Sequence, residues 1–243
     1  QPGEWHIIAK KFIAWASKKL IENTEALTWL RTERGVTQET AAKFQLGWSD
    51  HNIYRPKEEW GIEPNGKKMF IPSGLVIPWQ EKRIRVRRDD PGEYSKYHIV
   101  QGSTSDPMTI GNHYETTAII VESELDAILL AQEIKRPVFI VALGSCSIKP
   151  DEILLNKLSE CPVILIVLDS DGPGAKASKW WIENVSGTYR TLTPTAYGKD
   201  ITEAFLNDLD LNEWLIASME LCCEDILKDH PFFAEDNFNQ QVN

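Results

Sequence analysis

The second half of the chain alternates short apolar stretches with amphipathic ones, and no other feature of the sequence limits the fold so strongly. The most apolar stretch, PVILIVLD at 162–169, has the length of a strand and is typical of a central strand that is covered on both faces. Strands that alternate with helices indicate a parallel sheet, so we predict an α/β fold with helices flanking that sheet. The expected strands are 117–121, 138–143, 162–169 and 188–194, and the expected helices are 122–134, 150–160, 175–185 and 201–208.

The first half of the chain differs, because helical patterns come first and strand patterns follow. Helical periodicity covers 4–22 and 24–34, and Gly35 is expected to end the second helix as its C-terminal cap. Thr37 is expected to begin a third, short helix that ends at Phe44.

Antiparallel strands with turns are expected between 68 and 103, where Pro, Gly and an Asp-Asp-Pro-Gly segment interrupt alternating residues. One more amphipathic helix is expected at 210–230. We therefore expect three parts: a mixed α+β subdomain, the α/β domain and a helical tail. Their boundaries are 1–112, 113–205 and 206–243.

The composition makes several classes of protein improbable. No apolar run reaches 18 residues, so no transmembrane segment is expected, and the first residues do not have the pattern of a signal peptide. The four cysteines show no CxxC spacing, so we expect neither a zinc site nor a disulfide framework. This use of cysteine favours a reducing, cytoplasmic setting.

The net charge of −10 argues against a nucleic-acid partner, but the distribution of the charges matters more than their sum. Residues 82–88, KRIRVRR, hold five cations in seven positions. Strand alternation places Arg83, Arg85 and Arg87 on one face, which predicts either a phosphate-binding surface or a solvated face that discourages edge pairing. We favour phosphate binding.

Five carboxylates follow the expected strands of the second half, where parallel sheets bind their ligands. They are Glu122, Asp126, Asp169, Asp171 and Asp200. Unpaired carboxylates in such a cluster repel one another, whereas divalent cations would stabilise it. A spacing of four residues would place Glu122 and Asp126 on one helix face. Taken singly, Asp171 and Asp200 are also explained as helix caps, and Glu122 as a helix-starting residue.

The segments IIVESELDAI, VALGS, VLDSDGPGAKA and GKD together resemble a Toprim domain, the metal-binding module of bacterial primases, topoisomerases and some nucleases. Upstream, ALTWLRTERGVTQETAAKFQLGWSD, MFIPSGLVIPW, IRVRR and SKYHIV resemble the DnaG-type bacterial primases, with a phage or mobile element as a further possible source. The resemblance implies a Toprim-type parallel sheet after a mixed α+β, primase-like subdomain.

The resemblance also implies a function, which is synthesis of short RNA primers on single-stranded DNA by two-metal nucleotidyl transfer. Glu122, Asp169 and Asp171 would be the catalytic metal ligands, with Asp126 and Asp200 as supporting ligands for two Mg²⁺ or Mn²⁺ ions. The groove for the template and the nucleoside triphosphate would be lined by Arg34, Arg87, Arg88 and Lys96, to which the strand alternation adds Arg83 and Arg85.

The sequence departs from the primase pattern in four ways, one of which is a helical part after the Toprim module that is much shorter than in cellular primases. We expect neither the N-terminal zinc module nor the C-terminal helicase-interaction domain, so a replicative helicase would be met through other parts of the protein. Ser123-Glu124-Leu125 stands where the family has Gly-Tyr-Met, and we expect Glu124 to be solvated rather than part of the acidic cluster.

Three other functions remain open. A Toprim nuclease would use the same cluster, with Glu122 as general base. A non-catalytic DNA-binding module would have lost metal binding. A haloacid-dehalogenase-type phosphatase also carries a DxD motif after a strand, but Gly172-Pro173 follows here and the strand comes late in the chain.

Overall fold

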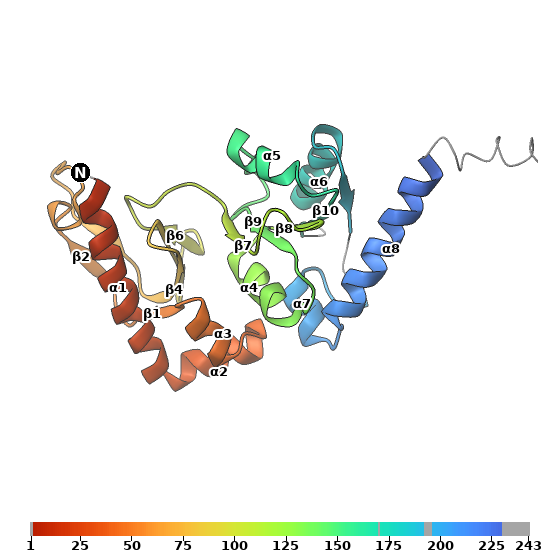
Figure 1. Ribbon diagram of the computed structural model, residues 1–243. Coiled ribbons are helices and arrows are strands. Elements are labelled where there is room, and N and C mark those ends of the chain that lie inside the picture. Colours follow the sequence, from red (N-terminus) through yellow and green to blue (C-terminus); the bar gives the residue numbers. More distant parts are fainter. Residues whose placement is uncertain (1, 170, 192–195, 230–243) are drawn as a thin grey trace, which may run out of the picture. The chain divides into compact units, whose positions relative to one another are not determined.

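The computed structural model describes residues 2–169, 171–191 and 196–229, except for the side chains of residues 2, 3, 190 and 223–229 (Figure 1). The chain divides into two compact units, residues 1–108 and 109–243. No helix of the described ranges is both long enough and apolar enough to cross a membrane.

The first unit packs a long helix, α1 (Pro2–Glu22), on an antiparallel sheet. Trp5, Ala9 and Ile13 of α1 share a buried core with Ile84 and Val86 of the sheet. The sheet has the order β1-β4-β5-β6, formed by Gly47–Ser49, Gly74–Trp79, Arg83–Arg88 and Tyr97–Ile99. A separate hairpin pairs β2 (Ile53–Arg55) with β3 (Met69–Ile71), and a short 3-10 helix, η1, covers Glu58–Trp60. The expected antiparallel strands are confirmed.

Two further helices precede β1, and their capping residues are those that the sequence predicts. Helix α2 covers Thr24–Arg34 and ends at Gly35, whose φ of 67° is the left-handed conformation that glycine adopts at low cost. The side chain of Thr37 accepts a hydrogen bond from the Thr40 amide at 3.2 Å and so begins α3 (Gln38–Lys43).

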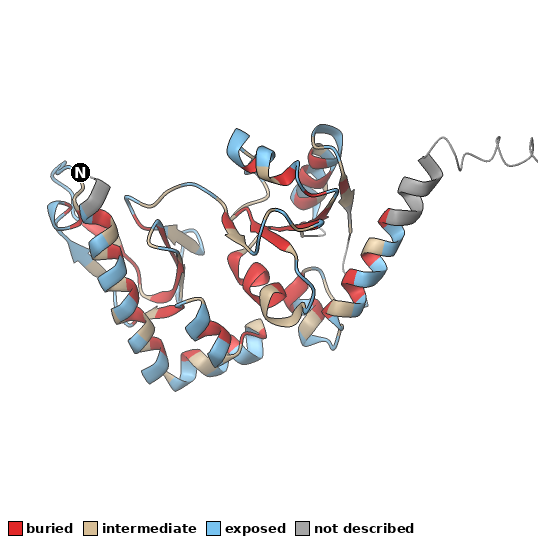
Figure 2. Ribbon diagram, in the orientation of Figure 1, coloured by how far each residue is buried: buried red, intermediate tan, exposed pale blue. Residues whose placement is uncertain are grey.

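The second unit is the expected α/β domain, with the strand order β11-β10-β8-β9-β7. The strands β8 to β11 run parallel to one another, and their ranges are Thr117–Val121, Phe139–Ala142, Val163–Val167 and Thr188–Arg190. β7 covers Met108–Ile110. The helices α4 to α8 cover Glu124–Glu133, Glu152–Leu158, Gly172–Asn184, Ile201–Leu206 and Leu211–Asp229. The central strands are buried, as Figure 2 shows.

Most boundaries differ from the sequence prediction by one or two residues, and the starts of two helices beside the carboxylates differ for an identifiable reason. Helix α4 begins at Glu124 rather than at 122, because the hydroxyl of Ser123 accepts the Asp126 amide at 3.1 Å and caps the helix. Helix α6 begins at Gly172, three residues earlier than expected, because Asp171 caps it and Pro173 is tolerated in a first turn. Residues 192–194 of the expected strand 188–194 lie outside the described residues.

Candidate functional site

The carboxyl ends of β8 and β10 form a switch point of the parallel sheet. From β8 the chain crosses to β9 on one side, and it later returns as β10 on the other side. Such a point leaves a crevice beyond the strand ends, where α/β proteins bind ligands. Val121 is paired with Val167 at the last rung of the two strands, so Glu122 and Asp169 follow within two residues of that rung.

Asp169 lies half-buried at this switch point. The pKa of its carboxyl is raised to about 6, mainly by burial and then by the charges of Glu122, Asp200 and Asp171 in that order, while Lys199 opposes them. The structure therefore brings these four carboxylates close enough for their charges to act on Asp169. The repulsion is the property that a bound divalent cation would relieve.

Asp171 and Asp200 both cap helices, as the simpler interpretation of each predicts. An Asp171 oxygen accepts the Gly174 amide at 2.8 Å, and an Asp200 oxygen accepts the Glu203 amide at 2.7 Å. Each of these bonds uses the Oδ1 atom of its carboxylate. Capping therefore fixes the two side chains through one oxygen of each carboxylate. The arrangement is compatible with metal binding by the same side chains.

Gly174 allows the first turn of α6 to lie directly against the backbone of Asp169. A Cβ atom at Gly174 would lie 2.1 Å from the Asp169 carbonyl oxygen. At Gly172, by contrast, no atom lies within 4 Å of the position of a Cβ. The glycine after Pro173 is therefore required by packing at the site.

Asp126 is buried in the first turn of α4 and is held by two hydroxyls. Ser123 donates to its Oδ2 at 2.6 Å, and Thr202 of α7 donates to its Oδ1 at 2.6 Å. The pKa of Asp126 is raised to about 6. Burial is the main cause, the hydrogen bonds from Ser123 and Thr202 oppose it, and the charges of Asp200 and Asp169 add to it. The residue thus connects the start of α4 to α7, a contact that no local sequence pattern indicates for Thr202.

Two sequence expectations about this turn are wrong. Glu122 precedes the capping residue of α4, so it lies outside the helix and does not share a helix face with Asp126. Glu124 is not solvated, because only 1% of it is exposed. The reason is that the whole first turn of α4 packs into the unit, with Leu125 and Asp126 buried beside Glu124.

The carboxylates do not form a ready-made metal cage. Within the described ranges, no group of three or more His, Cys, Asp or Glu side chains is arranged to hold a metal ion. The chemistry of the donors nevertheless fits Mg²⁺ or Mn²⁺, which prefer carboxylate oxygens and retain several waters and substrate oxygens. The mutual repulsion at Asp169 is the observation that supports this fit.

The basic segment of β5 has the expected alternation but not the expected exposure. Ile84 and Val86 face the core beneath α1, whereas Arg83 and Arg85 lie on the other face. These two arginines are only 3% and 9% exposed, so a solvated face is the wrong description. Arg83 donates to the Asp106 carbonyl at 2.6 Å, and the Arg85 guanidinium lies 4.1 Å from the centre of the Tyr97 ring.

Arg34 and Arg87 meet at one aromatic ring. Their guanidinium carbons lie 5.4 and 4.6 Å from the centre of the Trp29 ring. Burial lowers the pKa of Arg87, and the neighbouring charge of Arg34 lowers it further. Among the described residues, neither Nε atom has a hydrogen-bond partner although both are buried. Two like charges in this setting would be stabilised by an anion such as phosphate.

Arg88 makes contacts of its own, away from the Trp29 ring, and Lys96 lies in an exposed turn. The Arg88 guanidinium lies 5.5 Å from the Phe70 ring and 5.3 Å from the Tyr94 ring, and its Nε donates to the Ser95 carbonyl at 3.0 Å. By strand alternation Arg88 lies on the face opposite Arg87. The Lys96 side chain is exposed in the turn before β6.

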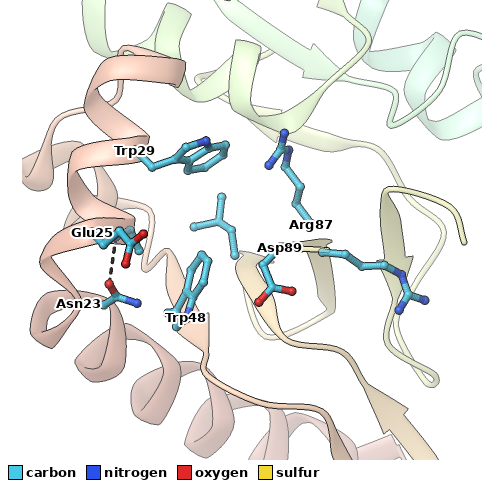
Figure 3. Close-up of a pocket in the computed structure, with 9 residues that line it drawn as sticks. Asn23, Glu25, Trp29, Trp48, Arg87 and Asp89 are labelled. Atoms are coloured by element: carbon cyan, nitrogen blue, oxygen red, sulfur yellow. Dashed lines mark hydrogen bonds between the residues drawn. The ribbon is translucent and has the colours of Figure 1, made fainter. Parts of the chain in front are cut away.

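A pocket of about 370 Å³ lies beside the Arg87 side chain, between α2 and the sheet (Figure 3). Sequence reasoning did not find it, since its aromatic walls are far apart in the chain. The only local signal was the position of Trp29 five residues before Arg34. The lining residues are Asn23, Glu25, Ala26, Trp29, Trp48, Leu75, Arg87, Arg88 and Asp89.

Comparison with known families identifies the class of the second unit. Residues 119–205 match the family model described as Toprim-like, which covers the strands and helices that carry the carboxylates. The expected Toprim fold is therefore confirmed for this part of the chain. No curated protein sequence matches the chain.

Solved structures extend the likeness to nearly the whole chain, and they are bacterial primase cores. The zinc-binding and RNA polymerase domains of the Aquifex aeolicus primase match with a TM-score of 0.68 and 20% identity over 98% of this chain, which spans 65% of that one. The E. coli primase catalytic core matches with a TM-score of 0.65 and 14% identity, covering 97% of this chain and 88% of that one. A DnaG primase catalytic domain bound to single-stranded DNA matches with a TM-score of 0.65 and 14% identity, covering 98% and 89%. The chain has the fold of a DnaG-type primase catalytic core.

Proposed function

We propose that this chain is the catalytic core of a DNA primase, a nucleotidyltransferase that makes short RNA primers on single-stranded DNA. The observation that carries the proposal is the set of carboxylates around Asp169 at the switch point of a Toprim domain. The likeness of nearly the whole chain to primase cores, one of them bound to single-stranded DNA, supports the same activity. The proposed partners are a single-stranded template, nucleoside triphosphates and, for the whole protein at the replication fork, a helicase.

Glu122, Asp169 and Asp171 would hold the divalent ions, with Asp200 beside them. Bound ions would supply charge neutralisation at the α-phosphate and activation of the 3′ hydroxyl. Asp126 remains a candidate supporting ligand, but its two hydroxyl partners favour a positioning role that keeps the turn after β8 against α7.

The chemistry needs no protein nucleophile. The 3′ oxygen of the growing chain forms a bond to the α-phosphorus, the bond from that phosphorus to the bridging oxygen of the β-phosphate breaks, and pyrophosphate leaves. The proton of the hydroxyl passes to solvent. The protein binds and orients the reactants, and the half-buried pair Arg34 and Arg87, whose Nε atoms are buried, is suited to hold a phosphate in a fixed direction.

The test is a primer synthesis assay with single-stranded DNA, ribonucleotides and Mg²⁺ or Mn²⁺, read on a denaturing gel. Asp169→Asn should abolish the ladder of short products. Asp208→Asn is the matched control, because Asp208 is an exposed aspartate of the same unit whose φ of 68° asparagine tolerates. Template shortening instead of product growth would favour a Toprim nuclease. An Asp169→Asn variant as active as the unmodified chain would refute the assignment of the site.

A further inference from the structure

The pocket beside Arg87 has the form of a binding site for one planar group. Its volume of about 370 Å³ lies within the range of about 300–1,000 Å³ that is usual for small-ligand sites. Figure 3 shows Trp29 and Arg87 on one side of the space and Trp48 on the opposite side, with Glu25 and Asp89 at its flanks. All these residues belong to the first unit.

One wall of the pocket is suited to stacking. Trp48 is half-buried and lines the pocket, and the buried Leu75 adds an apolar surface. The Trp29 ring is already in contact with the guanidinium groups of Arg34 and Arg87, so Trp48 is the ring that would stack on a base. Trp48 is paired with Leu75 across β1 and β4, which fixes the position of its backbone. Aromatic side chains in such settings bind the faces of nucleobases, and they do so without regard to sequence.

The flanks of the pocket carry charges that would read the edge of a base. Asp89 is held in place because its Oδ1 atom accepts the Ser73 hydroxyl at 2.8 Å and the Asp90 amide at 2.8 Å. In the described part of the chain, its Oδ2 atom has no hydrogen-bond partner, and neither Asp89 nor Glu25 forms an ion pair with Arg87. The pocket therefore holds both the Asp89 carboxylate, which can accept hydrogen bonds, and the Arg87 cation, and these two described groups are not paired with each other.

We infer that this pocket binds one base of single-stranded DNA and prefers bases with an exocyclic amino group, so that cytosine, adenine and guanine are bound better than thymine or uracil. An amino group at the base edge donates to a carboxylate such as that of Asp89, whereas the carbonyl of thymine at the equivalent position would face it with like partial charge. The phosphate of the same nucleotide would lie with Arg34 and Arg87. The inference rests on the proposed function, because it assigns a sequence preference to the template.

The test compares labelled oligomers of deoxycytidine and deoxyuridine, eight nucleotides each, by fluorescence anisotropy at one fixed salt concentration. Neither nucleotides nor divalent ions are added, so binding is measured apart from catalysis. The unmodified chain should bind the cytosine oligomer about fivefold more tightly, the lower limit for a base-edge contact because the pocket is open to water. Asp89→Asn keeps the shape and the contact with Ser73 and should remove most of this preference.

Further variants separate stacking from edge recognition. Trp48→Ala should weaken the binding of both oligomers about tenfold, and Trp48→Phe should restore much of it. Asp90→Asn, one residue from Asp89 and exposed, is the charge-matched control, and Tyr114→Ala in the second unit is the aromatic control. Circular dichroism and thermal unfolding establish that each variant is folded.

The inference is overturned if the unmodified chain binds both oligomers equally, binds neither, or keeps its preference in Asp89→Asn. Its failure is distinct from failure of the proposed function. A chain that makes primers but shows no base preference would refute the pocket alone. A chain that prefers cytosine but makes no primers would refute the proposed catalysis and leave the pocket standing.

Discussion

Removing the Thr202 hydroxyl tests whether Asp126 is a buried, charged link between α4 and α7. In Thr202→Val, the Oδ1 atom of Asp126 loses its 2.6 Å hydrogen bond and stays buried. A hydrogen bond to a charged group contributes about 1.5–3 kcal/mol, and a neutral one about 0.5–1.5 kcal/mol. We therefore expect a loss of about 2 kcal/mol in the free energy of unfolding at pH 8, where Asp126 is ionised.

The loss should depend on pH, and its direction follows from the pKa. The pKa of Asp126 is about 6 in the fold against an ordinary value of 3.8, so the folded chain binds more protons than the unfolded chain between these values. Stability therefore falls as the pH rises from 4 through 6, by about 3 kcal/mol for this group at about 1.4 kcal/mol per pKa unit. At pH 5 Asp126 is mostly protonated, so Thr202→Val should cost only about 1 kcal/mol there.

The assay is urea unfolding with EDTA at pH 5 and pH 8, followed by circular dichroism. Thr191→Val is the matched control, because Thr191 shares a 2.8 Å hydrogen bond with the neutral Ser218 hydroxyl in the same unit. Its cost should be about 1 kcal/mol at both pH values. Equal, pH-independent losses in the two variants would refute the idea that Asp126 is held as an ionised group.

Other substitutions test the rest of the site. Asp169→Asn should abolish primer synthesis yet raise the melting temperature in EDTA by about 1–2 °C at pH 8, because it removes a repelled and partly solvated charge; a lower melting temperature would contradict this. Gly174→Ala should cost about 2 kcal/mol or more in urea unfolding, whereas Gly172→Ala, which meets no atom, should be nearly neutral. Arg87→Lys keeps the charge but loses the planar contact with Trp29. The affinity for DNA should therefore fall about threefold or more, while the slope of the logarithm of affinity against the logarithm of salt concentration is unchanged. A smaller slope would show that the lysine charge no longer contacts a phosphate.

The sequence predicts the helices and strands of this chain better than it predicts which residues on them are buried. The apolar run 162–169 and the glycine at position 35 specify a central strand and a helix end by local chemistry, and both are confirmed. Alternation correctly places Arg83 and Arg85 on one face of β5. It does not predict that they are buried, because alternation assigns a residue to a face and carries no information about what covers that face.

The candidate site shows the same limit. The carboxylates after the strands can be found in the sequence, but the order of the strands, with β8 between β9 and β10, is a property of the folded sheet. Thr202 is 76 residues from the carboxylate that it binds, so no periodicity joins them. Ser123 is different, because a serine three residues before an acidic residue is a local pattern typical of a helix start. Since Ser123 is the capping residue, Glu122 lies before the helix.

The contact of two arginines with Trp29 has a consequence for the rate at which the chain would associate with DNA. The two cations contact one ring, and within the described ranges neither forms an ion pair with an acid, so their attraction for a phosphate persists, but only within a Debye length of about 8 Å at physiological salt. The net charge of −10 is screened over the same distance, so it adds no attraction for a polyanion at longer range. Encounters with single strands would therefore be slow and would gain nothing from long-range steering, so any tight complex must owe its affinity to slow dissociation.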